Sequence, residues 1–127
     1  MASIEDSNRI AKNLQEEVWR NMGLYDANYS KAIQILKDAL HEDPNNTTTL
    51  TNLGAALCDF GKHESAMPYL EKAVSLGSKD RHTYFNLGVA CMNCEKYRSK
   101  SSQYFNQAKE LESSEKTWEA YFDPHGH

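Results

Sequence analysis

The apolar residues in the middle of the chain recur at helical spacing. Leu50, Leu53 and Leu57 follow the spacing i, i+3, i+7, which places them on one stripe of a helix. The pattern predicts a helix from about residue 47 or 48, where a threonine can cap it, to residue 60. Gly61 is expected to end this helix, because glycine readily adopts the left-handed conformation that follows many helix C-termini.

Similar patterns on both sides predict further helices. They are expected at about residues 7–22, 27–41, 64–76, 80–94 and 97–111, with a short one at 114–122. Pro68 has no amide hydrogen to donate, so the helix that contains it is expected to start late or to kink. Trp118, Tyr121 and Phe122 stand at i, i+3 and i+4, which places them on one face of the last helix.

The tripeptide Asn-Leu-Gly occurs at residues 52–54 and returns 34 positions later at residues 86–88. A glycine inside a helix costs about 1 kcal/mol relative to alanine, so Gly54 indicates a close approach of a neighbouring helix. Ala66 and Ala73 on the next segment are the small residues expected to meet it. Consecutive helices are therefore expected to form tight hairpins, each of which needs the next one to cover its apolar face.

This pattern resembles the tetratricopeptide repeat, whose signature combines Leu-Gly, a small alanine and a later proline at a 34-residue period. Pro44 falls where that signature has its proline. The resemblance implies an all-α solenoid, a right-handed superhelix of three hairpins with a C-terminal capping helix. It divides a single domain, residues 1–127, into repeats at about 7–46, 47–80 and 81–113, followed by the capping helix and tail at about 114–127.

Two repeats depart from the regular spacing. The first hairpin is longer than the second, and the surplus is expected around residues 23–28 as an extra turn of helix or a longer loop. In the third hairpin Ala108 stands 35 positions after Ala73, which indicates a one-residue insertion near Tyr97.

The composition favours a soluble globular protein, with 39% hydrophobic and 25% charged residues. The net charge of −4 argues against nucleic acid as the main partner, because phosphate binding relies on clustered Lys and Arg. No apolar run is long enough to span a membrane, and residues 1–6 do not resemble a signal peptide. Three cysteines without secretion signals fit free thiols, so a cytoplasmic location is expected.

The resemblance also implies a concave groove that binds a protein or peptide partner. In some family members an asparagine just before Leu-Gly hydrogen-bonds the backbone of an extended peptide, and an amide suits this task because it both donates and accepts. The expected groove residues are Asn52, Ala55, Asp59, His82, Phe85, Asn86, Val89 and Asn93, with Thr51, Cys58 and Met92 beside them and Asn13 as a weaker third asparagine. The alternative is that asparagine is simply common at this place in such repeats.

No constellation of catalytic residues stands out, so we expect a non-catalytic adaptor or chaperone-like module without a cofactor. Cys91 and Cys94 lack the second ligand pair that a structural zinc site needs. Asp123, His125 and His127 lie on a tail with little to orient them as ligands. Metal binding through either set is the less favoured alternative.

The aromatic C-terminus leaves a further alternative open. A stack of hairpins exposes an apolar face at its end, and terminal repeats must cover that face. Trp118, Tyr121 and Phe122 would either form such a cap or dock another chain. In the second case the protein is a weak homo-oligomer whose groove stays empty.

Overall fold

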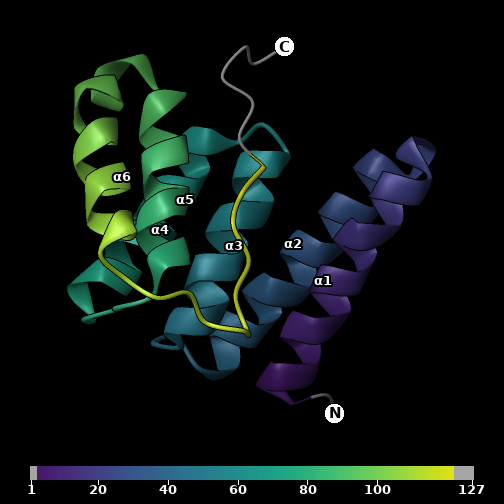
Figure 1. Cartoon of the computed structure of the whole chain (residues 1–127). Helices are drawn as coiled ribbons and strands as arrows, with labels where there is room; N and C mark the ends of the chain where they lie inside the picture. Colours follow the sequence, from purple (N-terminus) through teal and green to yellow (C-terminus); the bar gives the residue numbers. More distant parts are fainter. Residues whose placement is uncertain (1–2, 122–127) are drawn as a thin grey trace.

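The computed structural model describes residues 3–121, which form helices joined by short turns and, within that range, no strand (Figure 1). The elements are α1 (Ile4–Arg20), the 3-10 helix η1 (Met22–Leu24), α2 (Tyr25–Glu42), α3 (Thr47–Asp59), α4 (His63–Ser75), α5 (Arg81–Met92), the 3-10 helix η2 (Glu95–Lys100) and α6 (Ser101–Lys109). The pairs α1–α2, α3–α4 and α5–α6 form hairpins that stack in chain order. The predicted all-α solenoid of helical hairpins is confirmed.

One leucine from each of four successive helices forms the centre of the core. Leu36, Leu53, Leu70 and Leu87 come from α2, α3, α4 and α5, stand 17 positions apart, and are at most 1% exposed. The spacing is half of the 34-residue repeat, so each helix supplies one leucine to a continuous apolar column. Among residues 3–121, none of the helices combines the length and the hydropathy that a membrane span requires.

Side-chain caps and glycines set the helix ends. Asn46, rather than a threonine, caps α3, because its Oδ1 accepts the Thr49 N–H at 2.9 Å. Gly61 and Gly77 follow α3 and α4 with φ angles of +79° and +90°, as expected of glycines that end helices. α1 begins earlier than predicted because Ser3 caps it. The surplus of the first hairpin is helical, since α1 and α2 have 17 and 18 residues against 13 in α3 and in α4.

The contacts of two helical glycines reveal the register of the hairpins. A Cβ atom on Gly54 would overlap the Leu70 side chain, and one on Gly88 would overlap the Phe105 ring. The close approach predicted at Gly54 is confirmed, with Leu70 rather than either alanine as the nearest neighbour. Phe105 stands 35 positions after Leu70, whereas the two glycines are 34 apart. The extra residue of the third hairpin therefore lies between Gly88 and Phe105, where η2 replaces regular helix.

Of the two expectations for α4, the late start is wrong. This helix begins at His63 rather than late, with Pro68 inside it. Because Pro68 has no N–H, the carbonyl of Glu64 receives no helical hydrogen bond from the residue four positions on.

The predicted capping helix at 114–122 is wrong. Residues 112–121, called the C-terminal segment below, are not helical and run beside α3 (Figure 1, yellow). The aromatic spacing that suggested a helix is compatible with this path because the backbone groups of the segment bond to side chains of α3 and α5 instead of to one another. Phe122, the third residue of the predicted aromatic face, lies outside the described residues.

Candidate functional site

The inner face of α3 and α5 is covered by the C-terminal segment. Asn52 and Asn86, which were expected to face an open groove, are both 0% exposed. The covering chain passes the two asparagines in turn and travels in the same direction as α3, towards its C-terminal end (Figure 1). The protein therefore holds part of its own chain where the family resemblance implies a ligand.

Each asparagine forms two hydrogen bonds with the backbone of the segment. The amide of Asn52 donates to the Lys116 carbonyl at 3.0 Å and its Oδ1 accepts the Trp118 N–H at 3.2 Å. Asn86 repeats this arrangement two residues further on, donating to the Trp118 carbonyl at 3.1 Å and accepting the Ala120 N–H at 2.7 Å. The contacts match one edge of an extended strand, on which alternate residues present a carbonyl and an N–H.

Buried polar groups hold the two amides in place. The amide of Asn52 also donates to Oδ1 of Asn8 at 2.8 Å, and Asn8 donates to the Thr49 hydroxyl at 2.9 Å. The amide of Asn86 also donates to the Thr51 carbonyl at 3.3 Å. Asn8 was missed because sequence analysis counted only apolar residues as buried. Its spacing to Val18 and the other buried residues of α1 was the available signal.

At the start of α5, a carboxylate and an imidazole both form hydrogen bonds with one hydroxyl of the segment. Thr117 Oγ1 lies 2.6 Å from Oδ2 of Asp80 and 2.9 Å from Nδ1 of His82. A carboxylate only accepts, so the threonine donates to Asp80 and accepts a hydrogen from His82. Oδ1 of Asp80 also accepts the His82 N–H, capping α5, and the N–H of Ser114. The contact of Asp80 with the segment was not predicted from the sequence.

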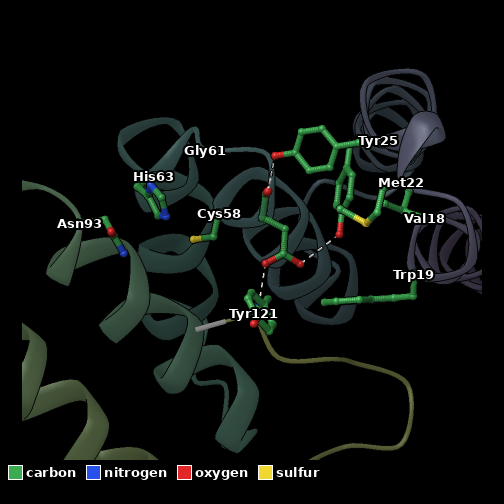
Figure 2. A pocket seen from close by; sticks show the side chains of 11 residues that line it. Val18, Trp19, Met22, Tyr25, Cys58, Gly61, His63, Asn93 and Tyr121 are labelled. Atoms are coloured by element: carbon green, nitrogen blue, oxygen red, sulfur yellow. Dashed lines mark hydrogen bonds between the residues drawn. The ribbon is translucent and has the colours of Figure 1, made fainter. Parts of the chain in front are cut away.

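At the C-terminal end of α3, Asp59 binds Tyr121, the last residue that the structure describes. Its Oδ1 accepts the Tyr121 N–H at 2.6 Å, and Oδ2 accepts the Tyr29 hydroxyl at 3.4 Å (Figure 2). Burial raises the pKa of the Asp59 carboxyl to about 6, and the two hydrogen bonds oppose that rise. Tyr25 donates its hydroxyl to the Asp59 carbonyl at 2.6 Å, so the end of α3 is tied to α2 as well.

A hollow of about 840 Å³ opens beside Tyr121 (Figure 2). The Tyr121 ring meets the Trp19 ring edge-on at 5.3 Å between centroids. The lining is mostly aromatic and apolar, with Asp59, His63 and Asn93 as polar members: Val18, Trp19, Met22, Tyr25, Tyr29, Cys58, Asp59, Gly61, His63, Asn93 and Tyr121. The hollow extends the inner face past the end of the described segment.

Comparison with known families agrees with this architecture. The sequence profile of a family described as Tetratricopeptide repeat matches residues 24–87, half of the chain. The chain belongs to the tetratricopeptide repeat family. Over 95 residues it is 26% identical to the small glutamine-rich tetratricopeptide repeat-containing protein 2 of Mycosarcoma maydis. The match covers 75% of this chain but only 27% of that relative, so the chain spans about a quarter of the relative's length.

Membership in the tetratricopeptide repeat family carries a general function. Such repeats generally mediate protein–protein interactions, and proteins of the family are typically not enzymes. Fold alone does not identify the partner.

The remaining predicted groove residues of this tetratricopeptide repeat protein have varied positions. Ala55 and Val89 are buried in the same hydrophobic cluster as Ala120 of the C-terminal segment. Phe85 packs against the Phe105 ring with centroids 5.3 Å apart. Asn93 lines the hollow and donates to the Val89 carbonyl. Asn13, the weaker third asparagine, is exposed on α1 and makes none of the contacts with the segment.

The alternative sites are placed as follows. Trp118 is half-buried against the core while Tyr121 is 58% exposed, so the second is the more open to solvent. Cys91 is buried and Cys94 partly buried, both as free thiols. Within residues 3–121, His, Cys, Asp and Glu nowhere gather as three or more around a possible metal position. Asp123, His125 and His127 lie outside the described residues.

The raised pKa of Asp59 predicts a pH-dependent stability. An ordinary Asp carboxyl has a pKa of 3.8, so the folded protein holds this proton more tightly than the unfolded chain does. The contribution of Asp59 to the free energy of unfolding should therefore fall as the pH rises from about 4 to about 6. The side chain of the Asp59→Asn variant cannot titrate. Between about pH 4 and about pH 6 the free energy of unfolding of this variant should therefore rise by about 1–3 kcal/mol relative to that of the wild type, since one pKa unit corresponds to about 1.4 kcal/mol.

Urea unfolding at several pH values measures this difference. Asp38→Asn, at an exposed position on α2, is the matched control and should follow the wild-type pH profile. If Asp59→Asn also follows that profile, the carboxyl is not the source of the pH dependence.

Proposed function

We propose that this protein is a non-catalytic interaction module that binds an extended peptide segment of a partner protein along the inner face of α3 and α5. Asn52 and Asn86 would hydrogen-bond the backbone of the partner, with Asp59 and His82 near the two ends of the groove. The observation that carries the proposal is the pair of two-point contacts that both amides make with the C-terminal segment. A foreign segment in the same conformation presents the same groups.

Recognition of the ligand backbone explains how a short groove can bind a peptide segment. Two asparagines supply four hydrogen bonds that do not depend on the side chains of the ligand, and they are already oriented by Asn8 and the Thr51 carbonyl. Preorganised donors and acceptors lose little freedom on binding. A short groove favours a modest affinity, in the micromolar range (~1 μM), which suits a reversible adaptor or chaperone-like contact.

The cytoplasm is the compartment that we propose for this activity. Cys58, Cys91 and Cys94 are free thiols in the structure, and thiols persist in a reducing environment.

A pull-down with matched variants tests the proposed groove. The bait is the full-length wild type, an Asn52→Ala, Asn86→Ala variant, or a control variant with Asn13→Ala and Asn106→Ala, two exposed asparagines on α1 and α6. A groove ligand should be recovered by the wild type and the control and lost by the first variant, with binding of its purified segment then measured by calorimetry. Equal recovery by all three baits, at unchanged helix content by circular dichroism, would contradict a groove-based function.

A further inference from the structure

Side chains of the C-terminal segment also contact the groove, and the surroundings of Thr117 are the most selective for one type of side chain. Its side chain is among the buried polar groups, at 5% exposed, between the Asp80 carboxylate and the His82 ring. A hydroxyl gives a hydrogen to the first and accepts one from the second through a single oxygen atom, which no other polar side-chain group of this size does. A valine of the same shape would leave two polar groups without partners, at a large cost in binding. This position therefore selects threonine or serine.

Ala120 occupies the second fitted place. It is 1% exposed and belongs to the hydrophobic core, and its N–H is bound by Asn86 at 2.7 Å. A longer side chain would have to push packed atoms apart while keeping that hydrogen bond, and protein interiors resist such overpacking. This position therefore accepts only alanine or glycine.

The two residues between them make different demands. Trp118 is half-buried and packs against the core, but among the described residues its Nε1 has no hydrogen-bond partner. The site thus holds the ring for its apolar area, which a large aromatic residue supplies. The side chain of Glu119 is exposed, and Asn86 binds the backbone of Trp118 and Ala120 on either side of it. Position 119 therefore tolerates any side chain.

We infer that the partner segment carries the pattern hydroxyl, aromatic, any residue, small residue in an extended conformation, and that residues 117–120 are a built-in copy that it must displace. This inference rests on the proposed function and adds the sequence that the groove selects. A tethered copy acts at an effective concentration of about 1 mM. An unmodified protein therefore binds a partner segment much more weakly than one whose own copy has been expelled.

Fluorescence anisotropy with full-length protein tests the inference. The probe is a labelled ten-residue peptide with the sequence of residues 112–121, Glu-Ser-Ser-Glu-Lys-Thr-Trp-Glu-Ala-Tyr. Ala120→Leu and, independently, Thr117→Val in the protein should expel the resident segment; Glu119→Leu is the matched control at an exposed position. Because the segment is not helical, circular dichroism at 222 nm should be the same for all variants if they fold.

The peptide should bind both expelled variants at least tenfold more tightly than the wild type or Glu119→Leu. Peptides that carry valine in place of Thr117 or leucine in place of Ala120 should bind at least tenfold more weakly than the original peptide. Leucine in place of Glu119 should change the affinity of the peptide less than about twofold. Equal binding of all peptides to the expelled variants would overturn the sequence pattern but not the proposed function. Equal binding of the original peptide to wild type and both variants would overturn displacement. Failure to bind either folded variant would overturn the peptide-binding function itself.

Discussion

Asn86→Ala is expected to release the C-terminal segment from the groove. The substitution removes the acceptor of the Ala120 N–H and the donor to the Trp118 carbonyl, and the Thr51 carbonyl loses a partner as well. Leaving buried polar groups unpaired costs about 1–3 kcal/mol. The amide hydrogen of Ala120 should therefore exchange with solvent at least tenfold faster, since about 1.4 kcal/mol corresponds to a tenfold change.

Hydrogen exchange followed by nuclear magnetic resonance measures this effect at single amides. Asn106→Ala, an asparagine exposed on α6, is the matched control and should leave the exchange of Ala120 unchanged. An Ala120 amide that stays protected in Asn86→Ala would mean that the other contacts of the segment hold it in the groove without Asn86.

Leu70→Ala is expected to have the largest effect on stability. Leu70 is 0% exposed, belongs to the leucine column through α2 to α5, and fills the space above Gly54. Removing a buried leucine side chain leaves a cavity and costs about 2–5 kcal/mol. For a domain of this size the melting temperature should fall by about 10 °C or more.

Calorimetry or thermal unfolding followed by circular dichroism checks this prediction. Leu76→Ala, at the exposed end of α4, removes the same atoms from a side chain that is 43% exposed and should change the free energy of unfolding by less than about 0.5 kcal/mol. Similar losses for both variants would show that the space around Gly54 collapses and that the column is not the source of stability.

The hairpins were predictable because their determinants are local. The helical spacing of leucines and the glycines at the helix ends depend on neighbours within one or two turns, and the 34-residue return of Asn-Leu-Gly can be read directly from the sequence. The one-residue insertion near Tyr97 was equally visible, because Ala108 stands 35 rather than 34 positions after Ala73.

The path of the C-terminal segment was not predictable from such signals. Trp118 and Tyr121 have a spacing that fits a helix, and nothing local contradicts it. The extended path is stabilised by side chains far away in sequence, above all Asn52 and Asn86, which bond its backbone in place of helical partners. The two asparagines could be singled out from their place in the repeat, but the identity of what they bind could not.

The C-terminal segment also changes how this repeat protein should fold. In a solenoid each repeat contacts only its neighbours, so contacts are short in sequence and folding can start anywhere and spread. Here Trp118 meets Asn52 across 66 positions and Tyr121 meets Asp59 across 62. Closing such long loops costs entropy and slows folding. We expect the hairpins to form first, and the segment to dock last and join them into one cooperative unit.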